Sequence, residues 1–171
     1  MSNLIKNISW FFGLILFQIL ILDEIDIGPY SVYFSPMLFS YLILRLKLDI
    51  SVSILLLYAF LIGITVDIFK DTIGLNAAAL LFVAILRKYF LSIISERDEF
   101  DSMVELDFFN LGFVRYLIYF GLGMITHHFV FALIEGFSFN GFLFLLYKSL
   151  INTFFALAIL FFIQYLIIKK K

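Results

Sequence analysis

The chain of 171 residues is 64% hydrophobic and only 15% charged, and its mean hydropathy is +1.10. A soluble domain usually carries about 25% charged residues, so this composition excludes a soluble globular protein. The formal net charge of −1 argues against a nucleic acid as a partner, and a sequence without cysteine holds no disulfide, reactive thiolate or cysteine metal site.

Uncharged, strongly apolar stretches follow one another along the chain. A bilayer core about 30 Å thick is crossed by about 20 helical residues, and the shorter stretches reach this length when flanking side chains are counted. We therefore predict an all-α, polytopic membrane helical bundle of six transmembrane helices in a single domain, 1–171. The helices are expected over residues 8–22, 32–46, 50–68, 72–91, 112–134 and 142–168, with a cytoplasmic acidic loop at 92–110.

The first apolar run follows Lys6, as in a signal peptide. No small-residue cleavage pattern comes after it, and the run ends directly in acidic residues, beginning with Asp23. We interpret it as a retained first helix. Gln18 lies in the middle of this helix, where a buried glutamine typically forms hydrogen bonds between helices.

The distribution of lysine and arginine predicts the orientation. With the amino terminus in the cytoplasm and six crossings, only Lys70 and Lys148 lie on the outer side. This asymmetry places both termini in the cytoplasm. It also makes 136–147 the beginning of the sixth helix or an interfacial segment, with Lys148 about two turns into that helix or at its mouth. The inner cations are Lys6, Arg45, Lys47, Arg87, Lys88, Arg97, Arg115, Lys169, Lys170 and Lys171.

The first outer loop, 23–36, contains both prolines of the chain. Proline lacks an amide donor, so Pro36 fits the first turn or a kink of a short second helix that runs on to Leu46. The charges that follow, from Arg45 to Asp49, predict a tight inner turn that makes the second and third helices neighbours.

Gly63 and Asp67 lie one turn apart on the same face of the third helix. A glycine lets another backbone approach closely, so the carboxylate of Asp67 is placed to accept hydrogen bonds from the amides that open the fourth helix near Gly74 and Asn76. This is a structural use of the acid. A proton or ion relay and contact with a partner are the alternatives.

The acidic loop at 92–110 carries six carboxylates and a single cation, Arg97. One interpretation is a solvated linker, and the other is a docking strip for a basic or cytoskeletal partner.

Two adjacent histidines lie deep in the fifth helix. His127 is 12 residues beyond Arg115, which places it about 18 Å along the helix, near or past the middle of the bilayer. His128 and Glu135 share a face, whereas the two histidines point about 100° apart. We predict neutral hydrogen bonding between helices rather than a metal site, which would need closer ligands; proton sensing is the alternative.

The sequence contains no phosphate-binding loop, nucleophile elbow or zinc-protease motif. We therefore predict a protein that is not an enzyme, with no catalytic residue, metal or cofactor.

Several short motifs occur in an order and spacing that resemble the rod shape-determining protein MreD family over essentially the whole chain. One is the glycine and aspartate of the third helix followed by an outer turn and small residues, and another is a glutamine ahead of a loop that ends in proline. A third, found in one branch of the family, is a histidine pair followed by an acidic and aromatic run. The matching residues are Gly63, Asp67, Gly74, Leu75, Ala77 and Ala78; Gln18 and Pro36; and His127, His128, Glu135, Phe137, Ser138 and Phe139.

The resemblance implies a multi-pass subunit of the elongation machinery in the bacterial inner (cytoplasmic) membrane. It would pair with the bitopic shape protein MreC and, indirectly, help organise the MreB filament, the glycosyltransferase RodA and a class B penicillin-binding protein. The family fold is similar to the substrate-binding subunits of energy-coupling-factor vitamin transporters. The family assigns no catalytic residue.

That similarity makes a vitamin-binding subunit of a transporter the second hypothesis. Such subunits dock on their coupling partner through small residues spaced four apart on the first helix. Here Gly13 is followed one turn later by Phe17, which is a poor match. A third hypothesis is an intramembrane enzyme or proton relay that uses Asp67, the two histidines and Glu135.

Overall fold

The computed structural model describes residues 2–72, 74–94, 106–136 and 141–168. Across these ranges all regular structure is helical and no strand is formed. The described part of the chain has four helices long and apolar enough to cross a membrane. They are α3 (Val52–Lys70), α4 (Leu75–Ile94), α6 (Phe113–Gly136) and α7 (Phe142–Ile168). The protein is therefore a membrane-embedded helical bundle.

The four long helices agree with the predicted ranges to within three residues at each end. Residues 142–147 belong to α7, so Lys148 lies in the second turn of that helix and not in a separate span. Most of the acidic loop, the Phe137–Ser138–Phe139 run and the last three lysines lie outside the described residues.

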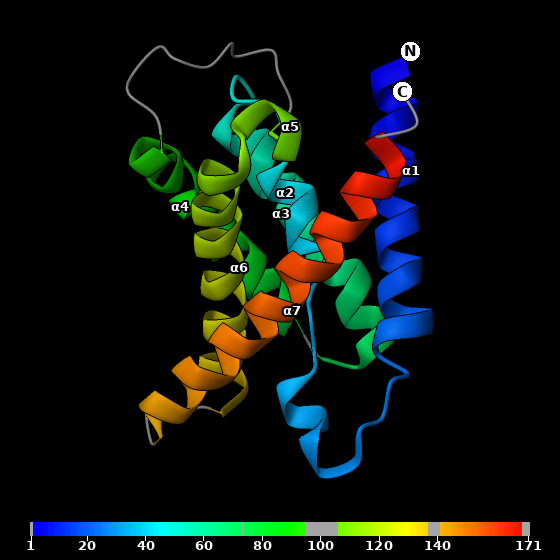
Figure 1. Ribbon diagram of the computed structural model, residues 1–171, viewed down its shortest axis with the longest axis vertical. Helices are drawn as coiled ribbons and strands as arrows, with labels where there is room; N and C mark the ends of the chain where they lie inside the picture. Colours follow the sequence, from blue (N-terminus) through cyan, green and yellow to red (C-terminus); the bar gives the residue numbers. More distant parts are fainter. Residues whose placement is uncertain (1, 73, 95–105, 137–140, 169–171) are drawn as a thin grey trace.

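The first apolar stretch forms α1 (Ser2–Phe17), which continues as one turn of π-helix, η1 (Gln18–Leu22). The apolar part, Asn7–Leu22, is shorter than the four long helices. In Figure 1 it runs beside the rest of the bundle and ends at the same level as the α3–α4 turn.

The second predicted helix, 32–46, is not continuous. Residues 28–46, called here the second segment, begin with the 3-10 helix η2 (Gly28–Tyr33), run through non-helical backbone, and end in the short α2 (Ser40–Leu44). The physical reason is Pro36, which has no amide to donate and disfavours the α conformation at the residue before it. Figure 1 shows the segment rising from the lower end of the molecule into its centre.

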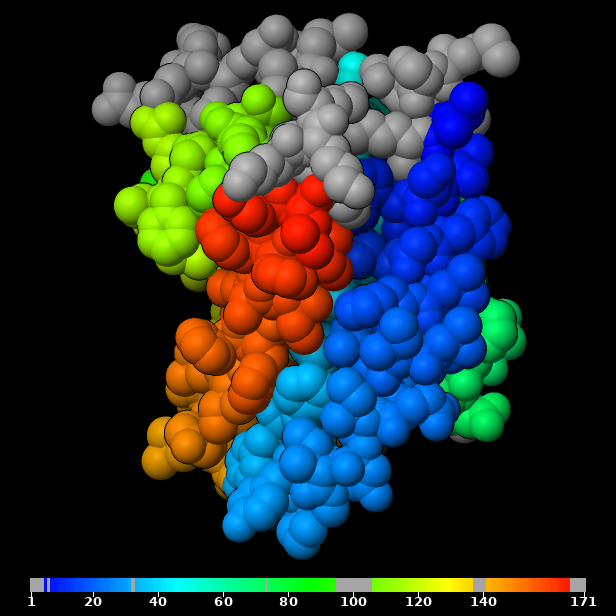
Figure 2. Space-filling model, turned by 45° about the vertical axis from the view of Figure 1, so that its right-hand side comes forward, coloured from blue at the N-terminus to red at the C-terminus, as the bar shows by residue number. Residues whose placement is uncertain are grey.

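The helices pack in a chain, α3 on α4, α4 on α6 and α6 on α7, while α2 touches α3, α4 and α6. A short helix, α5 (Phe108–Leu111), precedes α6 and is capped by the Asp107 carboxylate, which accepts a hydrogen bond from the Asn110 amide at 2.9 Å. In Figure 2, α7 lies beside the lower part of the second segment, and α1 lies higher on the opposite side of the same face.

All five residues of α2 are buried, so this short helix is the centre of the bundle. Its Tyr41 packs against Phe120 of α6 with ring centroids 5.2 Å apart, and against Trp10 of α1 at 5.5 Å. The contact between Trp10 and Tyr41 helps to hold α1 to the bundle, because aromatic side chains bury a large apolar area when they pack together.

Candidate functional site: polar side chains around the second segment

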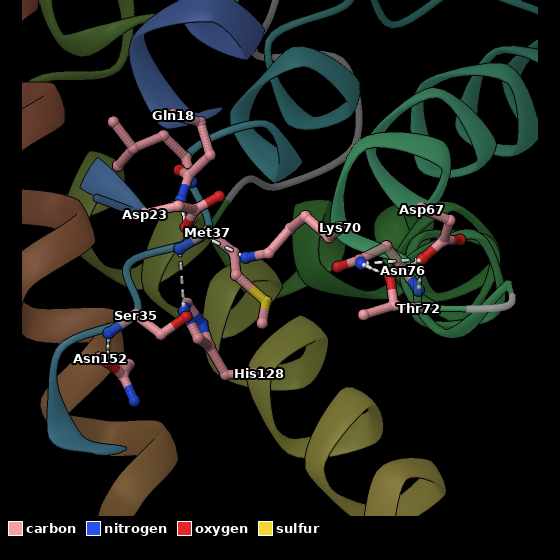
Figure 3. A network of polar contacts seen from close by, with 11 residues as sticks. Gln18, Asp23, Ser35, Met37, Asp67, Lys70, Thr72, Asn76, His128 and Asn152 are labelled. Atoms are coloured by element: carbon pink, nitrogen blue, oxygen red, sulfur yellow. Dashed lines mark hydrogen bonds and ion pairs between the residues drawn. The ribbon is translucent and has the colours of Figure 1, made fainter. Parts of the chain in front are cut away.

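Buried polar side chains from three other elements accept hydrogen bonds from the second segment's backbone amides (Figure 3). The amides lie where the segment is not helical, so they have no partner within a helix. At membrane depth, an unpaired amide costs several kcal/mol, and non-helical backbone is tolerated only where the protein itself supplies partners. The pairs are Ser35 N to Asn152 Oδ1 at 2.6 Å, Met37 N to His128 Nε2 at 3.2 Å, and Leu38 N to Gln18 Oε1 at 3.0 Å.

Both nitrogens of the His128 ring are used. Nε2 accepts from the Met37 amide, and Nδ1 lies 2.8 Å from the Met124 carbonyl oxygen, which can only accept. The ring is therefore neutral with its proton on Nδ1. This geometry matches the hydrogen-bonding interpretation of the histidine pair for His128.

Gln18 links the second segment to the carboxyl-terminal ends of α1 and α3. Its Oε1 accepts from the Leu38 amide, and its Nε2 donates to Asp23 Oδ1 at 2.9 Å. The same carboxylate oxygen of Asp23 accepts from Lys70 Nζ at 3.0 Å, at the end of α3. The glutamine thus forms hydrogen bonds between elements, as predicted. The group that it binds in the second segment is the backbone amide of Leu38 and not a side chain of another helix.

The other end of the second segment is held through its carbonyl oxygens. Tyr119 of α6 donates to the Leu44 carbonyl at 2.9 Å and accepts from Arg87 Nε of α4 at 3.0 Å. The same guanidinium donates through Nη2 to the carbonyls of Leu46 and Lys47. Arg87 and Tyr119 are both buried. The second segment is therefore fixed in its middle and at its carboxyl-terminal end by side chains of the surrounding helices.

Asp67 joins the end of α3 to the start of α4. Its Oδ2 accepts from the Ala77 amide at 3.0 Å, and its Oδ1 accepts from the Asn76 amide at 3.0 Å and from Asn76 Nδ2 at 2.9 Å. Oδ1 also accepts from the Thr72 hydroxyl at 2.5 Å. The predicted capture of the amides that open the fourth helix is confirmed, and it satisfies amides that have no partner within α4.

Two glycines shape the junction of α3 and α4: Gly63 allows a close helix contact, and Gly74 adopts a positive φ in the turn. A Cβ on Gly63 would lie 2.2 Å from Ala77 Cα, so α3 and α4 touch backbone to backbone at this point. Gly74 has a φ of +82°, in the left-handed region that favours glycine, and it ends the turn between the two helices. Gly63, Asp67 and Gly74 are thus brought together by the structure, as predicted.

His127 differs from its neighbour. It is fully buried, and neither ring nitrogen has a hydrogen-bond partner among the described residues. Its ring packs edge-on against Phe39 at 5.2 Å and lies 6.0 Å from the His128 ring. The described residues contain no group of three or more histidine or acidic side chains that could hold a metal ion.

The remaining predicted residues are spread over the bundle. Buried Pro36 lies within the second segment, beside the amides that Asn152 and His128 bind. Glu135, exposed near the end of α6, has its Oε2 4.0 Å from Lys148 Nζ. Arg115 is half-buried near the start of α6, at the other end of that helix. The structure does not bring Arg115 to the histidines.

Sequence reasoning missed Asn152, Tyr119 and Gln164, and it treated Arg87 only as an inner charge. Gln164 in α7 accepts from the Phe108 amide at 3.0 Å and donates to the Tyr116 hydroxyl at 2.7 Å. For Asn152 and Gln164, the available signal was an amide side chain within a mostly apolar helix, the same signal that singled out Gln18.

A polar hollow of about 190 Å³ opens between the second segment, the end of α3, α6 and α7. His128 and Asn152, which hold the second segment, form part of its wall. The lining residues are Ser31, Ser35, Met37, Lys70, Thr72, His128, Phe131, Ala132, Glu135, Lys148, Ser149 and Asn152.

Comparison of the chain with models of protein families, with curated proteins and with solved structures found no match in any of the three.

Proposed function

We propose that the protein is a non-enzymatic membrane scaffold of the MreD type, which maintains cell shape by organising lateral peptidoglycan synthesis in the bacterial inner membrane. The observation that supports this proposal is the use of the buried polar side chains. Gln18, Asp67 and His128 each accept a hydrogen bond from a backbone amide of the chain itself. Groups used in this way stiffen the bundle, and a stiff bundle with apolar outer faces suits the binding of a partner helix.

The partner in this proposal is an MreC-type bitopic protein, through which the scaffold acts on the MreB filament, RodA and a class B penicillin-binding protein. An apolar groove between α1 and α3 supports this proposal, since a transmembrane helix of the partner would fit against it. The groove is lined by Ile8, Phe11, Phe12, Tyr58, Leu61 and Ile62. Packing rather than a hydrophobic gain would hold the partner there, because lipid is equally apolar.

Co-purification with the MreC-type protein of the same genome tests the partner. Gly63→Leu and Asp67→Leu are unsuitable, because both residues hold α3 to α4 within the chain. Leu61→Trp fills the groove from an exposed position, and Ile85→Trp, exposed on α4, is the matched control. We expect Leu61→Trp alone to reduce co-purification and to fail to restore rod shape after depletion of the native protein. Equal recovery of the partner by both variants contradicts the groove as the contact.

The proposal also places six crossings in the membrane, with the second segment as the second crossing and both termini in the cytoplasm. The lack of cysteine makes this testable with single introduced thiols. Tyr30 and Asp49 are both exposed; Tyr30 lies near the beginning of the second segment and Asp49 lies just beyond its end. We expect Tyr30→Cys to react with a membrane-impermeant maleimide on intact spheroplasts, and Asp49→Cys only after permeabilisation. Labelling of both residues from the same side contradicts a second crossing.

A vitamin-binding subunit of a transporter is the second candidate, and the observation that favours it is the polar hollow. If the purified protein binds a vitamin with nanomolar affinity and recovers no MreC-type partner, the transporter subunit is the correct function.

A further inference from the structure

The only two cations that the sequence places on the outer side, Lys70 and Lys148, both line the polar hollow. They come from different helices: Lys70 is the last residue of α3, and Lys148 lies in the second turn of α7. Ends of membrane helices lie at the level of the lipid head groups, where lysine side chains reach towards the surface. The hollow therefore combines two ammonium groups at the depth where phosphate groups are found.

Each lysine of the hollow has one acidic partner. Its lining contains two lysines and one acid, Glu135, and the ion pair between Glu135 and Lys148 is long, at 4.0 Å. Lys70 donates to Asp23 at 3.0 Å. Because each ammonium carries three N–H donors and makes one such contact here, both retain donors for a further acceptor. The two lysines are thus each opposed by one acid but keep unused N–H donors, and the longer contact leaves Lys148 the less tightly paired of the two.

The walls are built by the same contacts that hold the second segment. Asn152 fixes the Ser35 amide on one side of the hollow, and His128 fixes the Met37 amide on another. These side chains are buried and paired, so the shape of the hollow does not depend on a ligand. Figure 3 shows Lys70, His128, Asn152 and the second segment around this region.

We propose that the hollow is a binding site for a phosphate group, which Lys70 and Lys148 recognise together. Lysine binds phosphate as a point charge with rotatable donors, and both ammonium groups of the hollow retain donors for a phosphate oxygen. A phospholipid head group and a small soluble phosphate ester share this chemistry. Glu135, at the rim, adds a site for an ammonium group such as that of ethanolamine. The proposal does not depend on a partner protein.

Native mass spectrometry of the purified full-length protein in detergent tests the site. The probes are phosphatidylglycerol, phosphatidylethanolamine, diacylglycerol, which lacks phosphate, and free glycerol 3-phosphate. The variants are Lys70→Gln, Lys148→Gln and Glu135→Gln, with Lys88→Gln as the matched control, since Lys88 is exposed towards the inner end of α4. Size-exclusion profiles and circular dichroism establish that each variant is folded.

We expect Lys148→Gln and Lys70→Gln each to weaken binding of the phosphate-bearing probe about fivefold, the loss of one lysine–phosphate contact near a membrane surface. Lys88→Gln leaves binding unchanged, and Glu135→Gln strengthens phosphatidylglycerol binding, because the acid no longer repels the anion. Binding of the lipids but not of glycerol 3-phosphate identifies a lipid source, and the reverse identifies a soluble one. Equal binding of diacylglycerol, or equal losses in Lys88→Gln and Lys148→Gln, overturns the proposal.

Discussion

The backbone amide of Met37 donates a hydrogen bond to Nε2 of His128, although the two residues are 91 positions apart in the chain. The contact joins non-helical backbone to the middle of a membrane helix. Because the amide has no alternative partner at that depth, the histidine is part of what makes the second segment possible.

Replacing His128 by phenylalanine keeps a ring in place but removes the acceptor for the Met37 amide. We expect the free energy of unfolding to fall by about 1–3 kcal/mol, the cost of leaving a buried donor unpaired. A lower midpoint of thermal unfolding in detergent would report the loss. His127→Phe is the matched control, since His127 makes no hydrogen bond among the described residues, and it should leave the midpoint unchanged or raise it. Equal destabilisation by the two variants would contradict the assigned role of His128.

Asp67→Asn removes the charge and one of the two acceptor oxygens at the start of α4. The amide group can no longer accept from both the Asn76 and Ala77 amides, so we expect a loss of about 1–3 kcal/mol in the free energy of unfolding. Asp71→Asn provides the comparison. Asp71 is exposed with a φ of 53°, a conformation that asparagine adopts readily, and its substitution should be close to neutral in chemical denaturation.

Gly63→Ala places a methyl group against the backbone of Ala77. The helices must separate, and we expect the free energy of unfolding to fall by about 1–3 kcal/mol, the usual cost of overpacking. Gly13→Ala adds the same methyl group to α1, where nothing lies within 4 Å of it. That variant should gain about 0.5–1 kcal/mol from helix propensity. A stable Gly63→Ala protein would show that α3 and α4 do not make this close contact.

Asp26, in the loop between η1 and η2, accepts hydrogen bonds from the Ser31 hydroxyl and the Gly28 amide, both at 2.8 Å. These bonds favour the charged carboxylate and lower the pKa of Asp26 below its ordinary value of 3.8. The contribution of these bonds to stability is therefore present above the ordinary pKa and is lost as the pH falls through the lowered one. An NMR titration should place the midpoint of the Asp26 carboxyl below 3.8. Ser31→Ala should raise its midpoint, and an unchanged midpoint would speak against the hydrogen bond.

The contact of Asp67 with α4 could be predicted because it is local. A carboxylate one turn after a glycine, followed by a short turn and a new helix, lies close to unpaired amides whatever the rest of the fold does. The four long helices were predictable for a similar reason, since length and apolar composition decide them.

The second segment could not be predicted, because its sequence is as apolar as that of a spanning helix and carries a single charge, Arg45, near its end. What allows it to depart from a helix is the set of acceptors and donors brought to it by Gln18, Asn152, His128 and Arg87, which lie far away in the chain. Pro36 showed where a helix would be interrupted but not that the backbone on either side would remain non-helical.

The distance along the chain between these partners has a consequence for biogenesis. The Ser35 amide is bonded to a side chain 117 residues further on, so that partner does not yet exist when the ribosome has made only the first third of the protein. The Ser35 and Met37 hydrogen bonds therefore form only after α7 and α6 have been synthesised. A chain truncated after α4 lacks both partners, and its Ser35 and Met37 amides lose these acceptors.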